Sequence, residues 1–160
     1  MGTVHATAIV LAAPRGPRGL LLTGASGAGK STLALALLDE WLAAGRFAAL
    51  VADDRTLLEV ANGRLLARAP ERSKGLVERR GFGIERRDHV AAARLHLHVA
   101  LGEPPERMPE PATSLFESIT LQRIDVPVLS GPHGAAAQGL VRTTLVQSAV
   151  QDEGANPQRP

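Results

Sequence analysis

One glycine-rich octapeptide constrains the fold of this 160-residue chain more than any other feature. It has the spacing GxxxxGK[ST] and reads Gly24, Ala25, Ser26, Gly27, Ala28, Gly29, Lys30 and Ser31. The apolar run Leu20 to Leu22 precedes it, and leucines at helical intervals follow it between residues 31 and 44. A strand, a glycine-rich loop and a helix in this order predict a P-loop, which binds the phosphate groups of a nucleotide.

The residue types in this loop have physical roles. Glycines let successive backbone N–H groups turn toward a phosphate, and the helix that follows adds a partial positive charge at its N-terminus. Lys30 is expected to reach the β- and γ-phosphate oxygens, and Ser31 is expected to bind Mg²⁺. We therefore predict that residues 24–31 hold ATP or GTP with a magnesium ion.

The remaining pattern predicts an α/β fold that is P-loop kinase-like, with a central mixed or parallel β-sheet, flanking helices and a β-hairpin. The expected strands are 4–11, 20–22, 47–52, 94–101 and 119–128. The expected helices are 31–44, which Gly45 should end, and 135–150. Asn62-Gly63 favours a two-residue turn between hairpin strands 56–60 and 65–69. We expect one domain over residues 1–150, irregular structure over 102–111, and a disordered tail over 151–160.

The composition limits the classes of binding partner that we expect. With one Trp, three Phe and no Tyr, the core must consist of Ala, Leu and Val, and aromatic platforms for stacked bases are not expected. The net charge is only +2 and the arginines are scattered in pairs, so we expect no nucleic-acid partner. No cysteine, no apolar stretch of about 18 residues and no basic leader are present, so we expect a cytoplasmic protein without membrane contact.

Two adjacent carboxylates follow the apolar strand 47–52. Asp53 and Asp54 match the second element of P-loop proteins, in which a carboxylate holds or orients the magnesium ion. A second carboxylate is not needed for hydrolysis, but it can accept a proton from an incoming hydroxyl group. The pair, together with the lack of an Asn-Lys-x-Asp guanine-reading motif, favours a small kinase over a GTPase or a motor.

Two further patterns are less specific. The segment from Glu78 to Ile84 combines a carboxylate, arginines and two glycines, which suits a turn close to a phosphate or an ordinary structural turn. In the strand 94–101, His96 and His98 alternate with apolar residues. This alternation predicts that both histidine side chains point to water.

Taken in order, these motifs resemble the HPr kinase/phosphorylase family, in a short form that lacks the N-terminal domain. The resemblance spans residues 4 to 146. The residues that carry it are His5, the octapeptide 24–31, Leu50-Val51-Ala52-Asp53-Asp54, Glu78-x-Arg80-Gly81-x-Gly83-Ile84 and Glu106-Arg107-x-Pro109-Glu110.

The resemblance implies an ATP-dependent kinase that phosphorylates a serine of the phosphocarrier protein HPr. The same site would remove that phosphate with inorganic phosphate and release pyrophosphate. Asp54 is similar to the family's general base and acid, and Ser31 and Glu78 are similar to its magnesium ligands. Asp53 is the supporting neighbour of Asp54 and the third residue assigned to the metal site. The remaining catalytic residues implied are Lys30, which binds phosphate, His5 and Arg107.

The resemblance also implies a homo-oligomer, a hexamer. The segment 127–134 contains no arginine where full-length members carry a basic loop, which puts the reverse reaction in question. Two alternatives stay open: a kinase of a small hydroxylated metabolite, and a nucleotide-sensing module without catalytic activity. An ordinary strand histidine is the alternative for His5, and a solvated loop residue is the alternative for Arg107.

Overall fold

The computed structural model describes residues 2–103, 106–129 and 133–151. Its strands are β1 (Gly2–Val4), β2 (Thr7–Leu11), β3 (Arg18–Thr23), β4 (Ala48–Ala52), β5 (Thr56–Ala61), β6 (Arg64–Arg68), β7 (Leu76–Arg79), β8 (Gly83–Arg86), β9 (Ala93–Gly102), β10 (Ala112–Phe116) and β11 (Ile119–Pro127). The helices are α1 (Lys30–Ala43), the short 3₁₀ helix η1 (Glu71–Ser73) and α2 (His133–Gln151).

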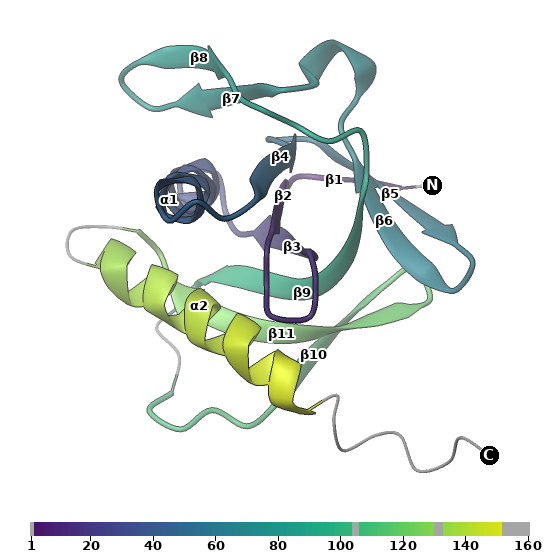
Figure 1. Cartoon of the computed structure of the whole chain (residues 1–160), viewed down its shortest axis with the longest axis vertical. Coiled ribbons are helices and arrows are strands. Elements are labelled where there is room, and N and C mark those ends of the chain that lie inside the picture. Colours follow the sequence, from purple (N-terminus) through teal and green to yellow (C-terminus); the bar gives the residue numbers. More distant parts are fainter. Residues whose placement is uncertain (1, 104–105, 130–132, 152–160) are drawn as a thin grey trace.

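The main sheet is mixed and strongly curled (Figure 1). Its strand order is β1-β5-β6-β9-β3-β2-β4, with β11 also paired to β9 and β10 paired to β11. Strand β9 runs parallel to both β3 and β11, whereas the other pairs in this sheet are antiparallel. The hairpin β7–β8 forms a separate two-stranded sheet. The predicted α/β class with a mixed sheet and flanking helices is confirmed, and the predicted hairpin is β5–β6.

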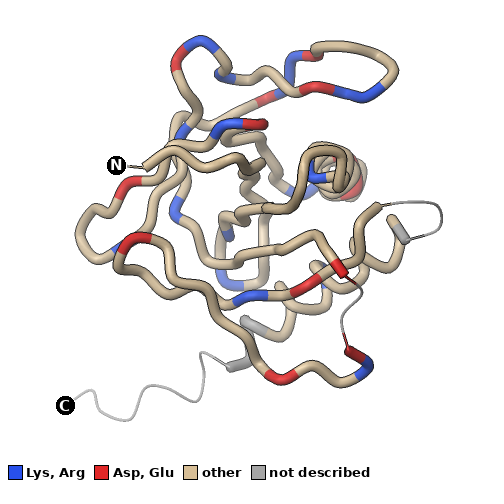
Figure 2. The backbone as a smooth tube through the Cα atoms, turned by 180° about the vertical axis from the view of Figure 1, so that it is seen from behind, with Lys and Arg blue, Asp and Glu red and all other residues tan. Residues whose placement is uncertain are grey.

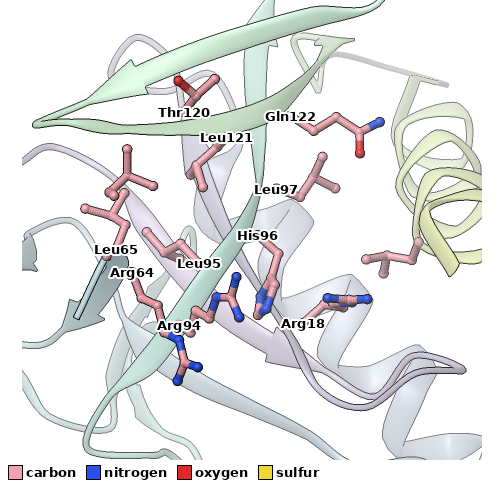
Figure 3. A pocket seen from close by; sticks show the side chains of 13 residues that line it. Arg18, Arg64, Leu65, Arg94, Leu95, His96, Leu97, Thr120, Leu121 and Gln122 are labelled. Atoms are coloured by element: carbon pink, nitrogen blue, oxygen red, sulfur yellow. The ribbon is translucent and has the colours of Figure 1, made fainter. Parts of the chain in front are cut away.

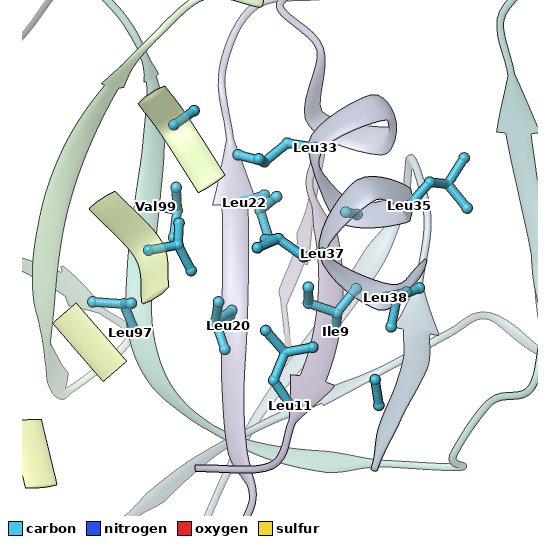
Figure 4. Close-up of a cluster of buried hydrophobic side chains, with 14 of the residues drawn as sticks. Ile9, Leu11, Leu20, Leu22, Leu33, Leu35, Leu37, Leu38, Leu97 and Val99 are labelled. Carbon is cyan, nitrogen blue, oxygen red and sulfur yellow. The ribbon is translucent and has the colours of Figure 1, made fainter. Parts of the chain in front are cut away.

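The central strands bury both of their faces, which explains their unbroken apolar sequences. Leu20 and Leu22 of β3 point into a core beneath the helices, where they meet Leu33 and Leu37 of α1 (Figure 4). Leu21 belongs to a second core on the opposite face, under the curled strands β5 and β6. The two cores consist mainly of leucines, alanines and valines, as composition predicted, and Trp41 is the only fully buried Trp or Phe among the described residues.

Two turn predictions are confirmed in detail. Asn62 and Gly63 have φ angles of 50° and 68°, the positive values that a two-residue hairpin turn requires between β5 and β6. Gly45 has a φ of 68° just after α1, and its N–H donates to the carbonyl of Leu42. A left-handed glycine at this position is a common helix end.

Elsewhere the observed elements differ from those predicted. The expected strand 4–11 is broken by a bend at His5, so that β1 pairs with β5 while β2 pairs with β3 and β4. Strand β10 was not predicted and lies antiparallel to β11. The segment 78–84 is more than a turn, because its ends belong to the strands of the hairpin β7–β8.

The prediction that His96 and His98 both point to water is wrong. His98 is 5% exposed, and its ring nitrogens lie 2.7 Å from the hydroxyl groups of Thr23 and Ser114. Phe116 packs edge-on against the same ring. His96 is half-buried, and its Nδ1 accepts the N–H of Gly19 at 3.1 Å. Ser114 and Phe116 of β10 cover the His98 side chain, which the alternation had assigned to solvent.

The predicted disordered tail 151–160 lies outside the described residues except for Gln151, which ends α2. Within the described part of the chain, no helix is long and apolar enough to cross a membrane.

Candidate active site

The glycine-rich loop connects the end of β3 to the start of α1, as predicted. Gly27 and Gly29 have φ angles of 79° and 101°, which side chains with a Cβ rarely adopt. Space is also limited, because a Cβ on Gly29 would lie 2.7 Å from Cβ of Leu129. The N–H of Leu129 donates to the carbonyl of Ala28 at 3.0 Å. The segment after β11 therefore rests directly on the loop.

Lys30 is held inside this loop. Its side chain is buried, and its Nζ donates to the carbonyl oxygens of Gly24 at 2.9 Å and Ala25 at 3.0 Å. The same Nζ lies 3.1 Å from Nε2 of His5. None of these three partners is a carboxylate, so they do not neutralise the ammonium group beside the loop. A phosphate group is a natural counter-ion for it.

Asp53 is a buried carboxylate that joins three parts of the chain. Its Oδ1 accepts the hydroxyl of Thr7 at 2.8 Å and the hydroxyl of Ser31 at 2.7 Å. Its Oδ2 accepts the backbone N–H of Glu78 at 3.1 Å. These bonds tie β2, the first turn of α1 and β7 to one side chain, and they compensate its burial at 6% exposure.

Asp54 behaves differently although it is the next residue. Its backbone has a φ of 62°, an unfavourable value for a residue with a side chain, and its carboxylate is 69% exposed. Oδ1 of Asp54 lies 3.0 Å from Nδ1 of His5, whose ring also reaches Lys30. Strained backbone at a polar site is commonly associated with function. The turn after β4 thus buries the carboxylate of Asp53 and leaves the carboxylate of Asp54 exposed to solvent.

The histidine between these groups has a defined tautomer. The ammonium group of Lys30 can only donate, so Nε2 of His5 must accept and Nδ1 carries the proton of the neutral ring. That proton is donated toward Asp54. Lys30, His5 and Asp54 therefore form a directed chain of hydrogen bonds from the P-loop to the exposed carboxylate.

These residues surround a cavity of about 300 Å³. Its lining residues are His5, Ser26, Gly27, Gly29, Lys30, Ser31, Thr32, Asp53, Asp54, Glu78, Arg80 and Leu129. Arg80 lies close to the P-loop, since a Cβ on Gly27 would be 3.4 Å from its Nη2. The cavity is open to solvent and has cationic groups on both sides of the loop.

The structure brings together most of the predicted site. The loop 24–31, His5, Asp53, Asp54 and Glu78 all converge on this cavity or its wall. Arg107 does not line it, and its side chain is exposed between β9 and β10. The segment 127–134 contributes Leu129, whereas residues 130–132 lie outside the described part.

Sequence reasoning missed Thr7 as a part of the site. Thr7 is completely buried in an apolar strand, and only its hydroxyl bond to Asp53 shows its role. A polar residue in an otherwise fully buried strand was the available signal.

An ionic network fixes the β7–β8 hairpin over α1. Glu85 accepts from Arg79 at 2.8 Å and from Arg87 at 2.6 Å, and Arg87 also donates to Asp39 of α1 at 2.8 Å. Hydrogen bonds from Arg79 and then Arg87 lower the pKa of Glu85 to about 2. Figure 2 shows both signs of charge along this hairpin. The network holds Glu78 and Arg80 beside the loop.

The oxygen ligands suit magnesium, a hard cation. Ser31 donates its hydroxyl proton to Asp53, which leaves its oxygen lone pairs available, and the carboxylate of Glu78 is exposed at the cavity. Among the described residues no cluster of three or more His, Asp or Glu side chains could hold a metal ion by itself. Magnesium is typically held by one or two protein groups, waters and the phosphates of a nucleotide, so the site fits Mg²⁺ bound with a nucleotide.

The fold and this loop define a P-loop α/β protein. The family model described as HPr Serine kinase C-terminal domain matches residues 6–89, and the chain belongs to that family. The match includes the P-loop, both aspartates and the β7–β8 hairpin, so the family assignment covers most of the cavity.

Individual relatives agree. An HPr kinase/phosphorylase of Azoarcus sp. (strain BH72) is 32% identical over 149 residues, covering 81% of this chain and 44% of that protein. An HPr kinase/phosphorylase of Clostridium perfringens (strain SM101 / Type A) is 42% identical over 66 residues, 41% of this chain and 20% of that protein. This chain therefore spans less than half the length of these curated relatives.

A solved structure resembles the whole chain. The Hpr(Ser) kinase/phosphatase from Coxiella burnetii superposes with a TM-score of 0.73 at 28% identity, over 96% of each chain. The similarity extends well beyond residues 6–89 and includes the C-terminal strands and helix.

Proposed function

We propose that this chain is an ATP-dependent kinase that phosphorylates a serine of the phosphocarrier protein HPr. The observation that carries the proposal is the pair of His5 and Asp54 beside the P-loop lysine. An exposed carboxylate oriented by a histidine is suited to accept the proton of an incoming hydroxyl group. Membership of the HPr Serine kinase C-terminal domain family supports a protein serine as the source of this hydroxyl group.

In the forward reaction the serine Oγ attacks the γ-phosphorus of ATP. The new Oγ–P bond forms as the bond between the γ-phosphorus and the bridging oxygen breaks, and ADP leaves with that electron pair. Asp54 takes the serine proton, while His5 holds the carboxylate in position. Lys30 and the loop N–H groups stabilise negative charge on the transferring phosphoryl group.

Ser31 and Glu78 would hold Mg²⁺, and Asp53 would orient the hydroxyl of Ser31 toward it. Bound with ATP, the ion supplies positive charge that neutralises the phosphate oxygens. Asp53 is suited to an orienting role because three protein donors already occupy its two oxygens.

Two observations favour a protein acceptor over a small metabolite. The cavity is open, and a metabolite kinase normally closes a lid over its substrate to exclude water. Beside it, the hairpin β7–β8 exposes Phe82 at 73% and Ile84 at 64%. Large apolar side chains presented in this way commonly mark protein contact surfaces. A docked protein would itself cover the reacting groups.

The reverse reaction, a hexameric assembly and a cytoplasmic location are further parts of the proposal that rest on the family. In phosphorolysis an oxygen of inorganic phosphate would attack the phosphoserine phosphorus, giving pyrophosphate, and Asp54 would return its proton to the serine oxygen. Arg107, which lies outside the cavity, could take part only after its loop moves or when a second subunit presents it. Residues 1–150 would form one catalytic domain.

The direct test combines this protein with ATP, Mg²⁺ and purified HPr, followed by mass spectrometry of HPr. We expect one added phosphate on HPr, none on HPr whose acceptor serine is replaced by alanine, and pyrophosphate when inorganic phosphate is then supplied. Asp54→Asn should lower transfer by about a hundredfold or more while ATP still binds. ATP binding without any transfer to HPr would contradict the kinase and leave the nucleotide-sensing alternative.

A further inference from the structure

The sheet divides at one point along β9, far from the P-loop cavity. Strand β6 pairs only with Ala93 and Arg94 of β9, whereas β11 pairs with β9 from Leu97 onward. Between these two partners the sheet forks. The start of β6, the start of β11 and the middle of β9 surround the fork, which we call the β9 fork.

His96 is the residue at the centre of the β9 fork. On the side of β3, Gly19 pairs with Leu95 and Leu20 pairs with Leu97. This β-bulge leaves His96 without a partner residue in β3. Among the described strands, His96 is the only residue of β9 without a partner in a ladder. The His96 side chain contacts β3 instead, because its Nδ1 accepts the N–H of Gly19 at 3.1 Å. That bond places the proton of the neutral ring on Nε2, which is thus a donor.

A cavity of about 280 Å³ occupies the β9 fork. Leucines from β6, β9 and β11 give it apolar walls, and its cationic side chains are Arg18, Arg64 and Arg94, with His96 between them (Figure 3). The guanidinium groups of Arg18 and Arg94 lie on either side of the His96 ring in this view. No aspartate or glutamate is among the described residues that line the cavity.

We infer that the β9 fork is a binding site for a small anion with two or more negative charges, separate from the nucleotide site. The inference goes beyond the proposed kinase reaction and does not depend on it. The two cavities have no lining residue in common. Arg18 begins β3 and Gly24 follows its last residue, about 20 Å away at the rise of an extended strand.

The positive charges of the arginines that line this cavity favour a bound anion. Within the described part of the chain, the side chains of Arg64 and Arg94 have neither a hydrogen-bond partner nor an ion-pair partner. The guanidinium groups of Arg64 and Arg94 are like charges that repel each other across one cavity, and a bound polyanion removes that repulsion while it accepts guanidinium hydrogen bonds. A planar guanidinium can donate two parallel bonds to a phosphate or a carboxylate, so the shared chemistry is a compact polyanion.

Local backbone geometry positions the arginines for this role. A Cβ on Gly19 would lie 2.2 Å from the carbonyl oxygen of Arg94, so only glycine permits this approach of β3 to β9. The approach places Arg18 next to Arg94. Bulges frequently re-aim side chains beside functional sites, and here the bulge turns His96 and its flanking arginines toward one cavity.

The test uses ¹⁵N-labelled protein titrated with pyrophosphate and, separately, with citrate at constant ionic strength. Amide resonances of Gly63 and Thr120 report on the fork, and those of Gly27 and Gly29 report on the P-loop. We expect millimolar pyrophosphate to shift both sets, Lys30→Ala to suppress only the P-loop shifts, and Arg64→Ala or Arg94→Ala to weaken only the fork binding by about tenfold or more. The citrate titration shows whether carboxylates serve as well as phosphates.

Arg72→Ala is the matched control, because Arg72 is an exposed arginine of η1 that lines neither cavity. It removes the same charge and should leave both sets of shifts unchanged. Fork amides that respond to neither anion would overturn the site. Equal weakening by Arg72→Ala and Arg94→Ala would also overturn it, because the response would then be general screening.

Discussion

Nδ1 of His5 lies 3.0 Å from Oδ1 of Asp54, and the backbone carbonyl of Asp54 accepts from the same nitrogen at 3.1 Å. One histidine therefore contacts both the backbone and the side chain of a residue whose φ is positive. Because the other ring nitrogen is occupied by Lys30, the ring cannot turn away without losing all three contacts. His5 fixes the direction of the proposed base.

Replacing His5 by alanine should therefore slow phosphoryl transfer more than it weakens nucleotide binding. Lys30 keeps its bonds to two loop carbonyls, so the loop stays formed. We expect the rate of HPr phosphorylation at saturating ATP to fall about ten- to a hundredfold, the effect of losing a hydrogen bond to a charged group. Calorimetry should find the ATP affinity changed by less. His89→Ala is the control, because His89 is exposed and outside the cavity. An unchanged rate in His5→Ala would contradict the positioning role.

Thr7→Val should destabilise the protein although it keeps the shape of the side chain. Valine removes one of the two hydroxyl donors to Oδ1 of Asp53, which is buried at 6% exposure. A lost bond to a buried charge costs about 1.5–3 kcal/mol. Urea denaturation measures the loss. Thr7→Ser, which retains the hydroxyl, should recover more than half of it, and equal losses in the two variants would point to packing instead.

Acid should loosen the β7–β8 hairpin through Glu85. Its pKa is lowered from 4.5 to about 2 by Arg79 and Arg87, so the folded state binds this proton less readily than the unfolded chain. The stabilisation is therefore complete above pH 4.5 and is lost as the pH falls toward 2. Glu85→Gln should cost about 1 kcal/mol at pH 7, as for an ion-pair network in contact with solvent. The difference from wild type should shrink between pH 4.5 and 2.5. A constant difference over that range would contradict the linkage.

His98 should remain neutral far below the usual range for histidine. Burial lowers its pKa from 6.5 to about 4, and Arg123 adds to this while Asp125 opposes it. The unfolded chain takes up this proton near pH 6.5, so the contribution of His98 to stability declines from pH 6.5 toward 4. An NMR titration of the ring Hε1 should find the midpoint near 4 in the folded protein and near 6.5 in urea. A folded-state midpoint near 6.5 would show that the ring is accessible to solvent.

Features set by local chemistry could be read from the sequence. The P-loop spacing, the Asn62-Gly63 turn and the glycine after α1 each depend on a few adjacent residues, and all three appear where predicted. The consecutive leucines 20–22 also predicted strand β3 correctly. The positive φ of Asp54 was not foreseeable in this way, since it arises where the turn after β4 meets His5.

Features that depend on residues far apart in the sequence could not be predicted from it. His98 alternates like a solvent-facing residue, but Ser114 covers it from a strand that follows a proline-rich segment and was not predicted. Thr7 gained its role from Asp53, 46 residues away. The β9 fork required the pairing of β9 with three other strands, which no local pattern specifies.

Gly19 has no positive φ, and glycine is required there only because no space exists for a side chain. A Cβ at this position would lie 2.2 Å from the carbonyl oxygen of Arg94 and 3.3 Å from Cα of Leu95. Because both neighbours are backbone atoms of a central strand, neither can move aside without displacing β9. Gly19→Ala should therefore cost about 1–3 kcal/mol, as overpacking does in a tight interior.

Gly102→Ala supplies the control, since a Cβ on Gly102 meets nothing within 4 Å at the far end of β9. Its unfolding midpoint in urea should stay close to that of the wild type, whereas that of Gly19→Ala should fall. Gly19→Ala should also lower the affinity of the fork for pyrophosphate, because the displacement separates Arg18 from Arg94 and breaks the bond to His96. A variant of unchanged stability and unchanged pyrophosphate binding would mean that β3 and β9 can separate here freely.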